Sequence, residues 1–314
     1  MTEALPKINP FLPPDWAPMR PLCPWKQSYQ RDYYVSVDDT DQAFKDFTQE
    51  MDDPTTLLHE GRLALVTGDS GCGKTALVHR CADDVARRLD GIGRTTEIID
   101  LTDVLNGRRQ QPTIDARMAI VCDRLFGALK SRGALRSDAV EELASDRDLP
   151  DRVYPYLPDA LVDGIVLVVL LPMVELADEV MRYAAYATER MLFLVESSLL
   201  TKDEVSGVIR AQEAWGRLIG LHVGPLKRGD VARYVNDRLD RHSTDGDYPL
   251  MSEETMSRVE PRLQSVAQLQ RALYGTYKER LRKAVRYDRS SSVTEQDIVD
   301  FLKSQYRDGP GRLP

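Results

Sequence analysis

An octapeptide with the pattern G-x-x-x-x-G-K-[ST] constrains this chain more than any other part of its sequence. It occupies residues 68–75, directly after the apolar run 61–67 and directly before a helical pattern over 76–89. Glycines let the backbone of such a loop point several N–H groups into one concavity, and the following helix adds its free donors and positive dipole end. The strand–loop–helix context therefore predicts a phosphate-binding loop.

The side chains of the loop predict how a nucleotide would be held. Lys74 would place a positive charge on the β- and γ-phosphates, and Thr75 would offer its hydroxyl as a ligand to Mg²⁺. Cys72 is at a free position of the motif, where it is either a plain small residue or a thiol activated by the helix N-terminus. The residues expected to bind the nucleotide are Gly68, Asp69, Ser70, Gly71, Cys72, Gly73, Lys74, Thr75 and Ala76.

Strand and helix patterns alternate along most of the chain. Besides 61–67, segments typical of strands lie at 95–101, 165–171, 191–195 and 218–223, with helical patterns between them, and 165–171 is almost continuously apolar. Parallel strands that are covered on both faces have nearly continuous apolar sequences of this kind. We therefore expect an α/β fold with a parallel five-stranded sheet flanked by helices.

Both ends of the chain depart from this alternation. Residues 1–32 are rich in proline and aromatic residues, which favours an extended arm that either packs over the core or docks a partner. From residue 246 onward the pattern is helical, with no convincing strand. The sequence predicts an arm at 1–32, a nucleotide-binding core at 33–245 and a helical domain at 246–314.

Composition argues against several classes of protein. The 314 residues carry a formal net charge of −8, which speaks against indiscriminate nucleic-acid binding. The longest apolar run, 165–174, contains Pro172 and falls well short of the roughly 20 residues that cross a bilayer, so we expect no membrane partner. The four cysteines lack CxxC or zinc-finger spacing, which favours a reducing, cytoplasmic location without disulfides or structural metal.

Hydrolysis of a nucleotide needs a carboxylate near Mg²⁺ and a group that positions water. Glu175 follows the run 165–171 after three other residues, and Glu196 directly follows 191–195. In one interpretation, Glu196 is the acid that faces the metal. In the other, that acid would be expected directly after the strand 165–171, where the sequence is degenerate, and Glu196 is a polar residue on the next strand. We favour the second interpretation. In both, the acid pair is incomplete, which predicts weak or partner-dependent hydrolysis.

Arginines before the last predicted strand could complete such a site. Arg217, and less strongly Arg210, could reach the γ-phosphate of a neighbouring subunit. The alternative is a solvated arginine on a helix face.

Residues 38–302 resemble the AAA+ superfamily. Within it, they are similar to the branch that contains origin-recognition-like ATPases, transposition regulators and STAND signalling ATPases. The phosphate loop is the sharp motif. The segment 223–238 resembles the last core strand and first lid helix, and 265–299 resembles the end of the lid. The resemblance implies ATP bound between core and lid, with Mg²⁺. It also implies a lid residue that touches the γ-phosphate: Arg271, or Gln270 in an equally plausible register.

Three functions remain open on this basis. The first is an ATP-binding switch whose nucleotide state controls assembly or partner engagement, with a homo-oligomer or another protein as partner. The second is a non-hydrolysing nucleotide-binding scaffold, and the third is a P-loop kinase for a small metabolite, although no arginine-rich lid precedes residue 200. Nucleic acid could bind through the basic final helices, but a solvated, salt-bridged face with inward tyrosines is favoured there.

Overall fold

Five parallel strands form the central sheet of the computed structural model, which describes residues 5–12, 20–106, 113–212, 218–283 and 286–307. Their order across the sheet is β2-β3-β4-β1-β5, so β1 lies between β4 and β5. The prediction of a parallel five-stranded sheet is thereby confirmed. The strands are β1 (Arg62–Thr67), β2 (Thr95–Asp100), β3 (Ile165–Leu170), β4 (Met191–Ser197) and β5 (Leu218–His222).

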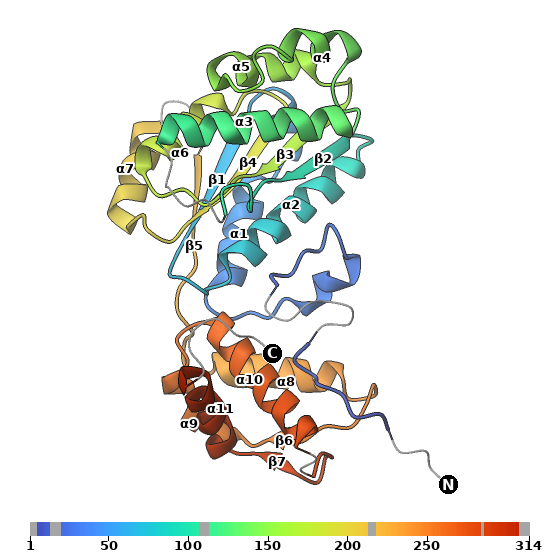
Figure 1. Ribbon diagram of the computed structural model, residues 1–314, viewed down its shortest axis with the longest axis vertical. Helices are drawn as coiled ribbons and strands as arrows, with labels where there is room; N and C mark the ends of the chain where they lie inside the picture. Colours follow the sequence, from blue (N-terminus) through green and yellow to red (C-terminus); the bar gives the residue numbers. More distant parts are fainter. Residues whose placement is uncertain (1–4, 13–19, 107–112, 213–217, 284–285, 308–314) are drawn as a thin grey trace.

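Helices cover both faces of this sheet (Figure 1). Alternate residues of one strand enter different clusters: Leu63 and Leu65 of β1 pack with α3 to α7, whereas Ala64 and Val66 pack with α1 and α2. A strand buried on both faces has no polar side, which explains the continuous apolar sequence of β3 and of most of β4, whereas the edge strands β2 and β5 keep exposed residues. The helices are α1 (Thr40–Glu50), α2 (Lys74–Asp90), α3 (Ile114–Ser131), α4 (Ser137–Leu143), α5 (Pro150–Ala160), α6 (Ala177–Tyr186) and α7 (Lys202–Gln212).

The C-terminal part of the chain forms a second, helical body (Figure 1). Its apolar cluster includes Val231 and Tyr234 of α8, so this helix packs with the C-terminal helices although it precedes residue 246. The expectation of no strand here was wrong, because β6 and β7 pair in parallel; two residues each are too few for an alternating pattern. The elements are α8 (Asp230–Arg241), β6 (Leu250–Met251), α9 (Glu253–Val259), η3 (Glu260–Arg262), α10 (Val266–Arg282), β7 (Ser292–Val293) and α11 (Glu295–Arg307).

The described residues of the N-terminal arm pack against both bodies. Near its start, Ile8 donates its backbone N–H to Asp247 O at 3.3 Å, and Phe11 is completely buried among the C-terminal helices. Further along, Trp25 Nε1 donates to His79 Nδ1 on α2 at 3.0 Å. The short 3₁₀ helices η1 (Ser28–Tyr33) and η2 (Pro54–Leu58) complete the elements of the chain's first part. The arm therefore bridges the sheet body and the helical body.

The basic residues of the last helices are largely engaged with acids. Arg280 pairs with Asp297 and Arg289 with Asp247, while Tyr277 is buried. This is the arrangement of a salt-bridged helix face with inward tyrosines. Within the part of the chain that the structure describes, no helix is long and apolar enough to cross a membrane.

Replacing Phe11 by alanine tests whether the arm stabilises the helical body. The Phe11 ring lies 4.8 Å from the Tyr277 ring and 6.4 Å from the Tyr234 ring, centroid to centroid. We expect Phe11→Ala to lower the free energy of unfolding by about 3–5 kcal/mol, the usual cost of such a cavity. Urea denaturation measures this, with Leu5→Ala as the control because Leu5 is exposed. Equal free energies of unfolding for the two variants would show that the arm does not stabilise the helical body.

Candidate functional site

The loop between β1 and α2 is held by glycines in conformations that other residues rarely adopt. Gly68 has φ 147° and Gly73 has φ 78°. A Cβ on Gly68 would also lie 2.3 Å from Val223 O, at the end of β5. The backbone therefore turns sharply enough for α2 to begin at Lys74, with its free N–H groups facing the loop.

Lys74 lies inside this loop. Its side chain is buried, and Nζ donates to Gly68 O and Asp69 O, both at 2.8 Å. Burial lowers the pKa of Lys74, and the negative charge of Glu196 acts in the opposite direction. The ammonium thus lies against the loop backbone, where it could exchange these two carbonyl oxygens for an anion.

Thr75 and Glu196 are in direct contact. The Thr75 hydroxyl lies 2.9 Å from Glu196 Oε2 and 3.1 Å from Oε1. The contact arises because β4 is the neighbour of β1, with Val66 opposite Glu196. Burial raises the pKa of Glu196, while the Thr75 hydrogen bond and the Lys74 charge oppose this.

Hydroxyl and carboxylate oxygens are ligands that suit Mg²⁺, so Thr75 and Glu196 fit this ion. Among the described residues there is no group of three or more His, Cys, Asp or Glu side chains that could hold a metal by itself. A magnesium ion here would take its other ligands from phosphate and water, as Mg²⁺ commonly does.

Glu175, the other acid considered from the sequence, has a different environment. Its carboxylate lies 3.6 Å from Arg117, which also pairs with the buried Glu179 at 3.1 Å and donates to Met173 O at 2.7 Å. These partners belong to α3 and α6 and to the loop before α6. Ser197 accepts the backbone N–H groups of the residues after β4 and so supports that turn. Arg217 lies outside the described residues.

The helical body touches the phosphate loop directly. The backbone N–H of Ala267, in the first turn of α10, donates to Gly71 O at 3.1 Å. A Cβ on Gly71 would approach Ser265 Oγ to 2.8 Å, so the two segments are packed without spare room. Further along α10, Gln270 faces a cavity beside the loop, whereas Arg271 is exposed and is not among the residues that line it.

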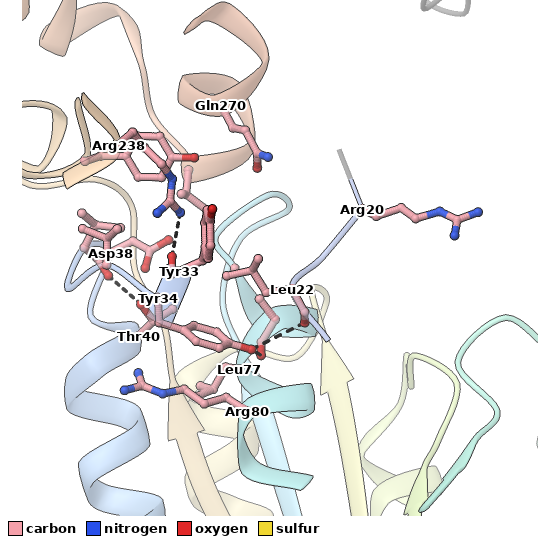
Figure 2. Close-up of a pocket in the computed structure, with 16 residues that line it drawn as sticks. Arg20, Leu22, Tyr33, Tyr34, Asp38, Thr40, Leu77, Arg80, Arg238 and Gln270 are labelled. Atoms are coloured by element: carbon pink, nitrogen blue, oxygen red, sulfur yellow. Dashed lines mark hydrogen bonds between the residues drawn. The ribbon is translucent and has the colours of Figure 1, made fainter. Parts of the chain in front are cut away.

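This cavity lies between the sheet body and the helical body (Figure 2). Its volume of about 90 Å³ leaves room for several water molecules. One wall is the strap, which we define as residues 33–40; the others come from the arm near Leu22, from Gly73 and α2, and from α8 and α10. The lining residues are Arg20, Leu22, Tyr33, Tyr34, Val35, Val37, Asp38, Thr40, Gly73, Ala76, Leu77, Arg80, Tyr234, Arg238, Val266 and Gln270.

Asp38 is a residue of this cavity that motif analysis missed. Its side chain is 1% exposed, and neither carboxyl oxygen has a hydrogen-bond partner. Both donors of the adjacent Thr40 go to Val37 O instead. Burial raises the pKa of Asp38 to about 7; the nearby hydroxyl and N–H of Thr40 act in the opposite direction, and the carboxylates of Asp230 and Asp39 reinforce the rise. The sequence gives no sign that this aspartate is buried without a partner, because its burial depends on three segments that are distant in the chain.

The Cys72 thiol in the phosphate loop is buried, and this affects its pKa and its reactivity. Its side chain is 1% exposed, and burial raises its pKa, an effect that the Asp38 and Asp69 charges reinforce. A raised pKa and low accessibility both slow thiol chemistry. The interpretation of Cys72 as an activated thiol was therefore wrong.

No protein-family model and no curated protein matches the sequence. Solved structures do resemble the fold. The Aeropyrum pernix ORC2 protein in its ADP form matches with a TM-score of 0.55 at 12% identity, covering 89% of this chain and 73% of that one. Cdc6p from Pyrobaculum aerophilum matches with 0.55 at 11% identity, covering 96% and 72%. Domain III of the Thermotoga maritima replication initiation protein DnaA matches with 0.50 at 13% identity, covering 91% and 98%.

The raised pKa of Asp38 predicts how stability depends on pH. Because the carboxyl is a weaker acid in the folded chain, its contribution to stability is complete below pH 4 and is lost as the pH rises through about 7. We expect Asp38→Asn to be more stable than the wild type at pH 8, by up to about 4 kcal/mol at 1.4 kcal/mol per pKa unit, and the difference to shrink toward pH 4. Urea titrations without nucleotide measure it.

The exposed Asp46 on α1 supplies the control for this titration, since Asp46→Asn should keep the wild-type pH profile. Parallel profiles for the wild type and Asp38→Asn would contradict a buried, unpaired carboxyl.

Proposed function

We propose that this chain, whose fold is that of AAA+ proteins, is a molecular switch. It binds ATP with Mg²⁺ between the sheet body and the helical body, which acts as the lid. Its nucleotide state controls assembly or partner engagement. The observation that carries this proposal is the hydrogen bond from Ala267 N to Gly71 O, because it connects the lid to the phosphate loop itself.

The phosphate chemistry follows from the loop. The amides around Gly71 and Gly73 and the first turn of α2 would bind phosphate oxygens, and Lys74 would neutralise their charge. Thr75 and Glu196 would hold Mg²⁺, which shields the charge between the β- and γ-phosphates. An adenine nucleotide agrees with the solved structure of Aeropyrum pernix ORC2 that is described as ADPNP-ADP complexes.

The proposed switch depends on loop residues that would contact both the phosphates and the helical body. Lys74 Nζ is hydrogen-bonded to Gly68 O and Asp69 O, and those bonds would give way to phosphate oxygens. The same loop supports α10 through Gly71. A triphosphate and a diphosphate would therefore stabilise different loop–lid arrangements, and that difference in affinity is the free energy that a partner can sense.

The carboxylate near Thr75 supports slow hydrolysis of ATP. Among the described residues, Glu196 is the carboxylate that contacts Thr75, and the next position is a serine that holds a turn. Activation of water would then need a group from a partner, for which Arg217 of a neighbouring copy remains our candidate. A chain that binds ATP but never turns it over, with or without a partner, would be the alternative nucleotide-binding scaffold.

Apolar side chains at the same edge of the sheet support a protein partner or a homo-oligomer. Leu176 and Leu199, in the loops after β3 and β4, are 54% and 60% exposed. The loop after β3 is fixed to the end of β4 where Val174 N donates to Glu196 O at 3.0 Å. A partner that covered these leucines would stand beside the acid that faces Thr75, which fits control of turnover by assembly. The four buried, unpaired thiols agree with the cytoplasmic location that we propose.

Replacing Lys74 by alanine tests nucleotide binding. Loss of a charged hydrogen-bond donor costs about 1.5–3 kcal/mol, so we expect ATP affinity to fall about ten- to a hundredfold. Isothermal titration calorimetry measures the affinity, and Lys130→Ala, at an exposed position of α3, should bind as the wild type does. Unchanged affinity in Lys74→Ala would refute the proposed site.

A matched pair of variants separates the two acids. We expect Glu196→Gln to remove most of the gain in ATP affinity that Mg²⁺ provides, by roughly tenfold, because the metal loses a charged ligand. Glu175→Gln should keep that gain, since Glu175 is paired with Arg117. ATP titrations with Mg²⁺ and with EDTA provide the measurement. The opposite ranking would assign the metal-facing position to Glu175.

A further inference from the structure

Two buried polar groups without partners face the same cavity beside the phosphate loop. One is the Asp38 carboxyl, whose oxygens are both unpaired, and the other is Nε of Arg238 on α8. Leaving such a group unpaired costs about 1–3 kcal/mol. Because the Asp38 carboxyl can accept and Arg238 Nε can donate a hydrogen bond, a ligand in this cavity would carry both a hydrogen-bond donor and an acceptor.

The carboxyl of Asp38 does nothing visible for the fold. Asp38 and Asp39 both have positive φ, 48° and 64°, a costly conformation for residues with side chains. The backbone of Asp38 is well anchored, because its N–H donates to Asp230 Oδ2 and its carbonyl accepts from Gly224 N, both at 3.0 Å. These bonds hold the side chain in the cavity without engaging it.

The position of the cavity suits the base of a nucleotide. Gly73, at the end of the phosphate loop, lines it together with Ala76 and Leu77 of α2. Figure 2 shows Leu77 on this side of the cavity. Asp38 Oδ2 would lie 3.3 Å from a Cβ on Gly73, so the carboxyl stands close to the loop. A nucleotide whose phosphates occupy the loop would extend its base along this turn of α2, between apolar and aromatic side chains.

We propose that Asp38, in its neutral form, recognises adenine: its carbonyl oxygen accepts from the 6-amino group and its hydroxyl donates to N1. This rests on the proposed nucleotide site. Adenine offers a donor next to an acceptor, and a neutral carboxyl presents the complementary pair. An ionised carboxylate presents two acceptors, which match the N1–H and 2-amino donors of guanine and repel N1 of adenine.

The balance of the groups around Asp38 favours the neutral form, although the hydroxyl and N–H of the adjacent Thr40 favour ionisation. The carboxylates of Asp39 and of Asp230 on α8 disfavour its ionisation, as does its burial. The arginines of the cavity are engaged elsewhere: Arg238 with Asp237 and Tyr33 O, and Arg80 with Asp41. The N-termini of α1 and α2, the Cys72 thiol and Arg20 complete the polar surroundings. With a pKa of about 7, the carboxyl is protonated at little cost near neutral pH.

Calorimetric titrations with ATP and GTP between pH 7 and 9, in the presence of Mg²⁺, test this assignment. The wild type should prefer ATP at least tenfold at pH 7 and lose ATP affinity by up to about tenfold per pH unit above it. Asp38→Asn, whose amide imitates the neutral acid, should bind ATP as the wild type does at pH 7 and lose the pH dependence. Asp38→Ala should bind ATP about ten- to a hundredfold more weakly, with GTP little changed.

The other outcomes are decisive as well. If GTP binds as tightly as ATP, or if Asp38→Ala keeps the preference for ATP, the assignment of Asp38 is wrong while the nucleotide site stands. If no nucleotide binds to the wild type, both proposals fail. Asp38→Asn without nucleotide should not lower the melting temperature, whereas loss of a carboxyl that served only the fold would lower it; asparagine is used here because it tolerates the positive φ of this position as aspartate does. Asp46→Asn should match the wild type in every titration.

Discussion

The sharp turn from β1 into α2 is the constraint on which the rest of this structure depends. It starts α2 directly after the loop and holds the Lys74 ammonium against the loop backbone, and its position is fixed because β1 lies between β4 and β5. Burial of β1 on both faces provides that rigidity. The close approach of Gly68 to Val223 O shows how tightly the turn is fitted to the neighbouring strand.

The same turn joins the two bodies of the molecule. Gly71 accepts a hydrogen bond from the first turn of α10, and the strap beside Gly73 is anchored to α8 through Asp230. The N-terminal arm adds a second connection, since Phe11 is buried in one body and Trp25 contacts the other. A ligand at the loop would thus touch the point at which the helical body is held, and the switch that we propose depends on this contact.

Sequence reasoning succeeded where the interactions are local in the chain. The phosphate loop, the strands and the helices that flank them follow from residues within a few positions of one another. It favoured Glu196 as a polar residue on the strand after a degenerate acid position over Glu196 as the metal-facing acid, and it could not show that Glu196 contacts Thr75, because that contact depends on which strand neighbours β1. It also left open the register of Gln270 and Arg271, since a helix face has meaning only once its partner is known. The pairing of β6 with β7 escaped it, since those strands are very short.

The sequence by itself determined the kind of site: a glycine-rich turn with one lysine and one threonine at the head of a helix, inside an α/β sheet. Those properties depend on backbone sterics and hydrophobic periodicity, which neighbouring residues specify. Only the tertiary structure decided that Glu196 faces Thr75, that α10 rests on the loop and that the Asp38 carboxyl is enclosed without a partner. Each of these depends on segments far apart in the chain, whose approach is set by how the sheet and helices pack.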